Sequence, residues 1–196
     1  ALGTSVLKLF DLTAASTGLN EKQARAAGVA YDKVVTYSAS HASYYPGARN
    51  MTVKTLFDPA SGRILGAQIV GFDGVDKRMD VLAAAIRAGL TAEQLTELDL
   101  AYAPPYGSAK DPVNMAGYVI ENVRAGLVEQ HHWDAVAELP ADGSVILLDV
   151  RTPGEVRKQG LLRSDALHIP LDELRGRLGE LDKGKKIYVN CYSGLR

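Results

Sequence analysis

Residues 51–72, MTVKTLFDPASGRILGAQIVGF, decide the fold of the first part of this chain. Two runs rich in Val, Ile, Leu and Phe flank residues 58–62, DPASG, whose residue types are those of tight turns. Two such runs joined by a short turn predict a β-hairpin. We therefore expect an antiparallel sheet built around this segment.

The flanking sequence adds strands before the hairpin and helices after it. Further strands are expected at residues 5–10, 11–19 and 31–45. After the hairpin, apolar residues recur at helical spacing from Met79 to Ile86, and Thr91 can begin a second, short helix. Asp111 followed by Pro112 is typical of a third helix start. Strands followed by helices predict an α+β domain over residues 1–127.

Residues 128–196 have a different pattern. GSVILLDV at residues 143–150 is a continuous apolar run, as expected of a buried parallel strand. A helix is predicted to begin at Thr152, and leucines at helical spacing over residues 171–181 predict a second. KKIYVN at residues 185–190 predicts another buried strand. The order strand, helix, helix, strand indicates an α/β domain, and the change of class places the domain boundary near residue 127.

Composition excludes several classes of function. The 196 residues carry a net charge of −1, which gives no electrostatic reason to bind nucleic acid or an anionic membrane. One cysteine excludes an internal disulfide and fits a reducing compartment, and no apolar run approaches the roughly 20 residues of a membrane span. We therefore expect a cytoplasmic protein. We expect no metal site.

The single cysteine, Cys191, follows the last predicted strand in NCYSGLR. A thiol reacts as the thiolate, so a reactive cysteine needs stabilised negative charge. A tight loop containing Gly194 can turn backbone N–H groups inward, and Arg196 adds positive charge. The alternative is a buried, unreactive cysteine. The position of Cys191 directly after a strand, together with the glycine and the arginine, favours the interpretation as an active site.

This segment resembles the rhodanese family of sulfurtransferases over HHWDAVAEL, ILLDVRTPGEV, ALHIPLDELRGRL and KKIYVNCYSGLR. The resemblance implies that Cys191 is the nucleophile that carries a persulfide and that Asp149 and Arg151 are structural. The implied loop around the sulfur consists of Tyr192, Ser193, Gly194, Leu195 and Arg196. GLLRSDALHIPL departs from the family pattern, so a local loop change is expected. Related phosphatase loops hold one more residue between cysteine and arginine, and the four residues here favour sulfur.

Two loops of the first domain are rich in tyrosine: YYPGA at residues 44–48 and AYAPPYG at residues 101–107. Tyrosines of this kind mark either an interface or simple loop packing. With LAYAPPYGSAKDPVNMAGY, they resemble the dimerisation domain of pyridine nucleotide–disulfide oxidoreductases, over roughly residues 2–125. The resemblance is to the branch of coenzyme A disulfide reductases, NADH oxidases and persulfide reductases.

The second resemblance implies a homodimer in which Tyr44 and Tyr102 reach the flavin-side cysteine of the partner subunit, with Tyr45 and Tyr106 as second choices. A phenol there can act as an acid toward a thiolate or disulfide. Lys77 and Arg78 in GVDKRMD are expected at a solvated helix start, with phosphate contact as the alternative.

Together the resemblances imply the C-terminal part of an FAD- and NAD(P)H-dependent reductase of coenzyme A disulfide or persulfides. Its fused rhodanese domain would be truncated after the catalytic loop. No G-x-G-x-x-G follows a strand, so this chain alone is expected to bind neither cofactor and to be inactive as a reductase. One alternative is a stand-alone sulfurtransferase or sulfur carrier with an accessory dimerisation domain. Another is a non-catalytic dimerisation module with a vestigial rhodanese half.

Overall fold

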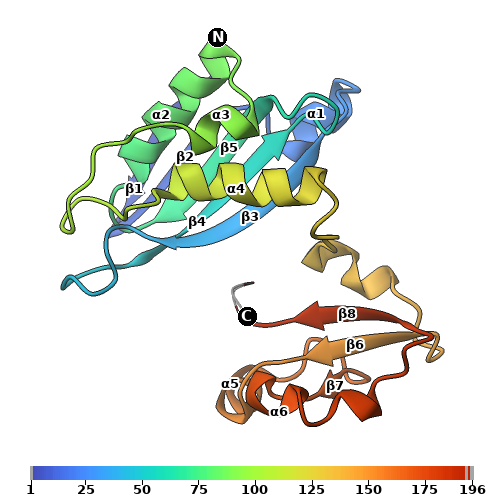
Figure 1. Ribbon diagram of the computed structural model, residues 1–196. Coiled ribbons are helices and arrows are strands. Elements are labelled where there is room, and N and C mark those ends of the chain that lie inside the picture. The colour runs from blue at the N-terminus through green and yellow to red at the C-terminus, as the bar shows by residue number, and fades with distance from the viewer. Residues whose placement is uncertain (1, 193, 195–196) are drawn as a thin grey trace. The chain divides into compact units, whose positions relative to one another are not determined.

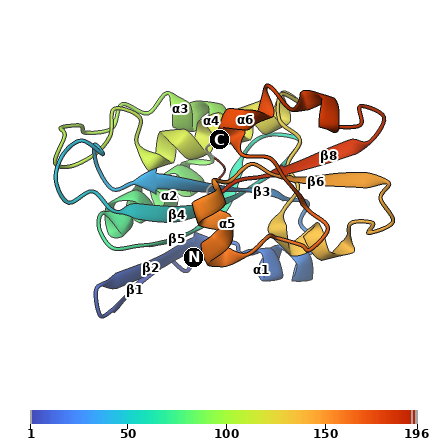
Figure 2. The same cartoon turned by 90° about the horizontal axis from the view of Figure 1, so that it is seen from below.

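The computed structural model describes residues 2–192 and 194, and it divides into two compact units, Ala1–Glu129 and Gln130–Arg196. The first unit is built on a five-stranded antiparallel sheet with the strand order β1-β2-β5-β4-β3, which can be followed in Figures 1 and 2. Its strands are β1 (Ser5–Leu9), β2 (Leu12–Gly18), β3 (Asp32–Ala39), β4 (Asn50–Phe57) and β5 (Ile64–Gly71).

The predicted hairpin is the centre of this sheet. Strands β4 and β5 pair in the register Thr52 with Val70, and the register shifts between Leu56 and Phe57. Asp58 closes the turn because its Oδ1 accepts from the backbone N–H groups of Ala60 and Ser61, at 2.8 and 3.2 Å. The antiparallel sheet expected from residues 51–72 is confirmed.

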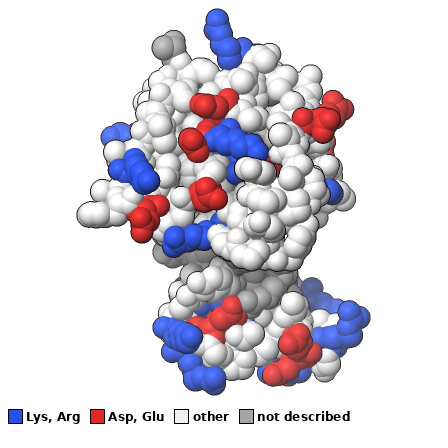
Figure 3. Space-filling model, turned by 90° about the vertical axis from the view of Figure 1, so that its left-hand side faces the viewer, with Lys and Arg blue, Asp and Glu red and all other residues white. Residues whose placement is uncertain are grey.

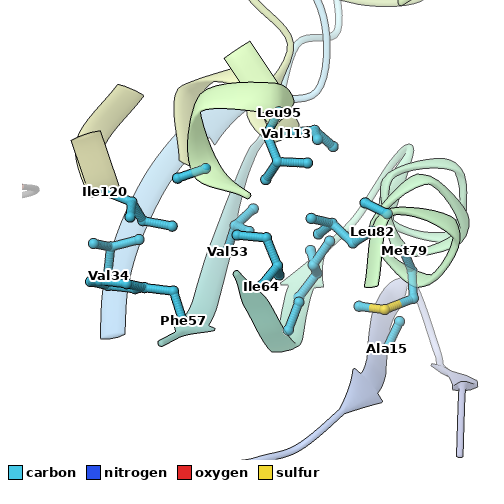
Figure 4. Packing of buried hydrophobic residues seen from close by; sticks show 14 of the residues in the cluster. Ala15, Val34, Val53, Phe57, Ile64, Met79, Leu82, Leu95, Val113 and Ile120 are labelled. Atoms are coloured by element: carbon cyan, nitrogen blue, oxygen red, sulfur yellow. The ribbon is translucent and has the colours of Figure 1, made fainter. Parts of the chain in front are cut away.

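Four helices belong to this unit: α1 (Glu21–Ala26), α2 (Val75–Ala88), α3 (Ala92–Thr96) and α4 (Pro112–Arg124). Helices α2, α3 and α4 cover one face of the sheet (Figures 1 and 2). Figure 4 shows Met79 and Leu82 of α2, with Leu95, Val113 and Ile120 from the other two helices, pointing toward the apolar side chains of the strands. Burial of this one apolar face is the main stabilisation of the unit. The predicted α+β class is confirmed for these residues.

One strand is shorter than predicted. Residues 31–45 were expected to be extended throughout, but β3 ends at Ala39 and residues 40–49 form a loop. The N–H of Ser40 donates to the carbonyl of Arg49, which closes the base of the loop, and the N–H of Ala42 donates to a different loop altogether. These backbone groups are therefore satisfied without extending the ladder.

The second unit contains a parallel sheet in the order β7-β6-β8. Its strands are β6 (Val145–Asp149), β7 (Leu167–His168) and β8 (Lys186–Asn190), and its helices are α5 (Pro153–Gln159), α6 (Leu171–Leu174) and the two 3₁₀ turns η1 (Trp133–Glu138) and η2 (Leu178–Glu180). The predicted start of α5 is observed, since Thr152 and Glu155 form a capping box. A small apolar cluster of Leu148, Val150 and Ile169 holds the unit together.

Three details of the second unit were not predicted correctly. The leucines of residues 171–181 do not form one helix, because Gly176 falls between α6 and η2 and Gly179 lies within η2, and glycine weakens a helix interior. Strand β8 is not buried, because it lies at the edge of the described sheet, and Val189 is 60% exposed. The two-residue strand β7 was missed, since two residues are too few to show a period.

Charged side chains of both signs are interspersed on the face drawn in Figure 3. Among the described residues, no helix is both long and apolar enough to cross a membrane. Within the same residues, no group of three or more His, Cys, Asp or Glu side chains is placed to hold a metal ion.

Candidate functional site

The two tyrosine-rich loops of the first unit lie against each other. We call residues 40–49, between β3 and β4, the first tyrosine loop, and residues 97–110, between α3 and α4, the second tyrosine loop. The backbone N–H of Ala42 donates to the carbonyl of Gly107 at 2.9 Å and to that of Pro104 at 3.3 Å. Backbone hydrogen bonds thus join two loops that are about sixty residues apart in the sequence.

The hydroxyl groups of Tyr44 and Tyr102 meet at the surface of these loops. Their oxygens are 3.3 Å apart, and the residues are 76% and 49% exposed. The hydrogen bond with Tyr44 raises the pKa of Tyr102 above its ordinary value. A tyrosine phenol is protonated at neutral pH, so Tyr102 can donate a hydrogen bond to a neighbouring group.

The two second-choice tyrosines lie in the same loops but differ in surroundings. The ring of Tyr45 packs edge-on against that of the buried His41, with 5.8 Å between the ring centroids. Tyr106 is 73% exposed, and its backbone N–H closes a turn onto Ala103 at 2.8 Å. The hydroxyl pair that the structure brings together is that of Tyr44 and Tyr102.

The expectation of a solvated helix start at Lys77 and Arg78 is wrong for Arg78. That side chain is only 1% exposed and is ion-paired with Asp111 at 2.8 Å, because the second tyrosine loop and α4 close over it. Lys77 points to the second tyrosine loop, and its Nζ donates to the carbonyl of Ala101 at 3.4 Å. The sequence carried no signal for the pairing of Arg78 with Asp111, since 33 residues separate them.

Cys191 of the second unit follows β8 directly. It is half-buried and packs beside the cluster of Leu148, Val150 and Ile169. The backbone N–H of Gly194 donates to its Sγ at 3.0 Å, and Gly194 has a φ of 78°, a conformation that favours glycine. Tyr192 is 59% exposed. The remaining predicted loop residues, Ser193, Leu195 and Arg196, lie outside the described residues.

Asp149 and Arg151 connect the end of β6 to the helix that follows. Arg151 donates to both oxygens of Asp149, with Nη2 to Oδ2 at 2.6 Å, and also to the carbonyl of Gly160 at 2.7 Å. Burial alone would raise the pKa of Asp149, but the hydrogen bonds from Arg151 outweigh it and lower that pKa. All of these contacts join residues of the second unit to one another.

The first unit is therefore an antiparallel sheet covered by helices on one face, with an exposed, hydrogen-bonded pair of tyrosine hydroxyls at its loops. Residues 4–112, more than half of the chain, match the family described as pyridine nucleotide-disulphide oxidoreductase, dimerisation domain. The chain therefore belongs to this family.

Named relatives agree with this assignment. The coenzyme A disulfide reductase of Staphylococcus haemolyticus is 46% identical over 117 residues, which are 60% of this chain and 26% of that protein. The crystal structure of reduced Bacillus anthracis CoADR-RHD is similar with a TM-score of 0.91 and 50% identity over 97% of this chain. An NAD-dependent persulfide reductase from A. fulgidus is similar with a TM-score of 0.84 and 42% identity over 99% of this chain.

This chain covers only a small share of the length of these relatives. This chain spans about a quarter of the length of the curated relative, and 34% of the length of each of the two solved structures. The likeness to those two structures extends over both units of the chain.

Proposed function

We propose that this chain is the C-terminal part of an FAD- and NAD(P)H-dependent reductase of coenzyme A disulfide or of persulfides, and that it acts as a homodimer. Support comes from the family, from the coenzyme A disulfide reductase of S. haemolyticus and from the persulfide reductase of A. fulgidus. The observation that carries the proposal is the exposed pair of Tyr44 and Tyr102, whose hydroxyl oxygens are 3.3 Å apart.

In this proposal the tyrosine pair serves the sulfur centre of the partner subunit. When a thiolate attacks a disulfide, one S–S bond forms, another breaks, and a second thiolate leaves. Tyr102, whose hydroxyl lies beside that of Tyr44, donates a hydrogen bond to the leaving sulfur and so stabilises the negative charge that develops there. Two exposed hydroxyls on a domain surface suit this role, because the reacting sulfur has to come from another surface.

FAD and NAD(P)H supply the electrons when they are bound in the longer protein. The sequence of this chain has no G-x-G-x-x-G after a strand, so its residues do not fit a dinucleotide site. We therefore assign cofactor binding to the rest of the longer protein and assign no step to a cofactor here.

The test uses the longer reductase with Tyr44→Phe, Tyr102→Phe and the double variant. Each single variant should lower kcat for NAD(P)H-dependent reduction of coenzyme A disulfide by about tenfold, with little change in KM. The double variant should lose little more, because the two hydroxyls are in contact and act as one pair. Tyr37→Phe, at another half-exposed tyrosine on β3, is the matched control and should keep full activity. Full activity in the double variant, or a monomer in light scattering, would contradict the proposal.

We further propose that residues 128–196 are a rhodanese-like domain and that Cys191 accepts sulfane sulfur. Support comes from the position of Cys191 after a parallel strand and from the Gly194 N–H that donates to its Sγ. Attack of the thiolate on thiosulfate would form a persulfide on Cys191 and release sulfite, and cyanide would then remove the outer sulfur as thiocyanate. A stand-alone sulfurtransferase remains the alternative, but the family match of residues 4–112 favours the fused reductase.

A further inference from the structure

Arg78 is a buried cation that contacts both tyrosine loops at once. Its side chain comes from the first turn of α2 and is 1% exposed. Its Nη2 donates to the carbonyl of Ser40 in the first tyrosine loop at 2.9 Å and to that of Tyr106 in the second at 3.5 Å. Ser40 precedes Tyr44 by four residues, and Tyr106 follows Tyr102 by four.

Asp111 holds the guanidinium in this place. Its Oδ2 accepts from Nε and Nη2 of Arg78 at 3.1 and 2.8 Å, and its Oδ1 also caps α4 by accepting from the N–H of Val113 at 3.1 Å. The Nη1 of Arg78 donates to the carbonyl of Gly74 at 3.2 Å. Two helices and both loops therefore meet at one planar cation, and a buried charge with this many partners is not free to move.

We infer that Arg78, held by Asp111, is a positioning residue that sets the distance between the hydroxyl groups of Tyr44 and Tyr102. The inference rests on the proposed function for its catalytic consequence, but not for its geometry. The planar fork of arginine reaches Asp111, Ser40 and Tyr106 together, whereas the single ammonium of lysine cannot span the same acceptors. Loss of the fork should let the two loops shift relative to each other, although the backbone hydrogen bonds of Ala42 still join them, while the charge that neutralises Asp111 is retained.

The test is Arg78→Lys in the longer reductase, with Arg87→Lys on the exposed side of the same helix as the matched control. Arg78→Lys should lower kcat by about tenfold with little change in KM, because a small misplacement of an acid is costly. The double variant Arg78→Lys/Tyr44→Phe should be no slower than Tyr44→Phe, since both changes remove the same hydroxyl pair. If the loss of kcat in the double variant were the product of the losses in the two single variants, the inference would be overturned.

A spectroscopic readout separates this inference from the proposed function. Alkaline titration of tyrosine absorbance, taken as the difference between each protein and its Tyr102→Phe version, reports mainly the ionisation of Tyr102, and in the Tyr44→Phe background it reports that of Tyr102 alone. In Arg78→Lys the pKa of Tyr102 should fall toward its ordinary value, as it should in Tyr44→Phe, because the raised pKa depends on the Tyr44 hydrogen bond. This result would support the positioning role even if Tyr44→Phe left reductase activity unchanged. An unaltered titration would overturn it.

A second variant covers the case in which Arg78→Lys does not fold. Asp111→Asn keeps a good cap for α4 but removes the negative charge that holds Arg78. It should shift the Tyr102 titration in the same direction, by a smaller amount. An unshifted titration in a folded Asp111→Asn protein would count against the inference.

Discussion

At the residue scale, Glu21 joins the start of α1 to the face of the sheet. Its carboxylate is ion-paired with Lys33 of β3 at 2.8 Å and with Lys54 of β4. Burial alone would raise the pKa of Glu21, but the hydrogen bonds from the two lysines outweigh it and lower the pKa from 4.5 to about 2. Three charges on a partly buried surface are stable here only because they pair.

This arrangement predicts a pH dependence of stability. A lowered carboxyl pKa stabilises the folded state above the unfolded value of 4.5, and the stabilisation is lost as the pH falls through about 2. Glu21→Gln should therefore lower the free energy of unfolding by about 1–2 kcal/mol at pH 7, with solvent screening allowed for, and the difference should shrink as the pH falls. Urea unfolding at several pH values measures this. The exposed Glu97→Gln is the control, and a pH-independent difference would contradict the assignment.

At the element scale, a pair of glycines lets the chain cross the end of the sheet between β2 and α1. Gly18 and Gly66 are opposite each other in the β2–β5 ladder, and the N–H of Leu19 donates to the carbonyl of Leu65 at 3.0 Å. A Cβ on Gly66 would lie 1.9 Å from the carbonyl oxygen of Leu19. The contact is with backbone, which cannot rotate away as a side chain can.

Gly66→Ala should therefore destabilise the first unit. We expect a loss of about 3 kcal/mol, at the upper end of the range for overpacking, because the strand crossing itself has to shift. Thermal unfolding followed by circular dichroism measures the loss. Gly154→Ala is the control, since a Cβ there would approach no atom more closely than 3.9 Å. Equal stability of the two variants would show that the close approach of Gly66 to the carbonyl oxygen of Leu19 does not constrain the residue at position 66.

At the scale of the whole molecule, the chain has two units with separate cores and two separate candidate sites. The larger core lies between the five-stranded sheet and α2, α3 and α4, and the smaller core surrounds Leu148, Val150 and Ile169. The tyrosine pair belongs to the first unit and Cys191 to the second. Separate cores let each site keep its geometry when the other is changed.

The two proposed activities should therefore be lost independently. In the longer protein, Cys191→Ser should lower sulfur transfer from thiosulfate to cyanide by about 10³-fold or more, as expected for loss of a nucleophile, and should leave reduction of coenzyme A disulfide intact. Tyr44→Phe/Tyr102→Phe should do the reverse. Thiocyanate formation and NAD(P)H oxidation measure the two activities. Turnover of a phosphate ester that depends on Cys191 would contradict the sulfurtransferase proposal.

Local signals were strong enough to predict most elements of the fold. The hairpin appears at residues 51–72, as its sequence pattern indicates. The same holds for the helix caps at Thr91 and Asp111 and for the strand at residues 145–149. Prediction was wrong where the deciding contacts were distant. The strand after residue 31 ends early because Ala42 bonds to the second tyrosine loop, and Arg78 is buried by a loop that follows it by about twenty residues.

The sequence by itself determined the features that depend on neighbours along the chain. These are the turns, the helix caps, the periods of helices and strands, and the presence of Tyr44, Tyr102 and Cys191 in their loops. Only the tertiary structure decided that Tyr44 and Tyr102 share a hydrogen bond, and that one buried arginine lies behind both of their loops. The physical reason is the range of the interactions. Propensity and capping act within a few residues, whereas closure of the two loops depends on packing α2 and α4 against a common sheet.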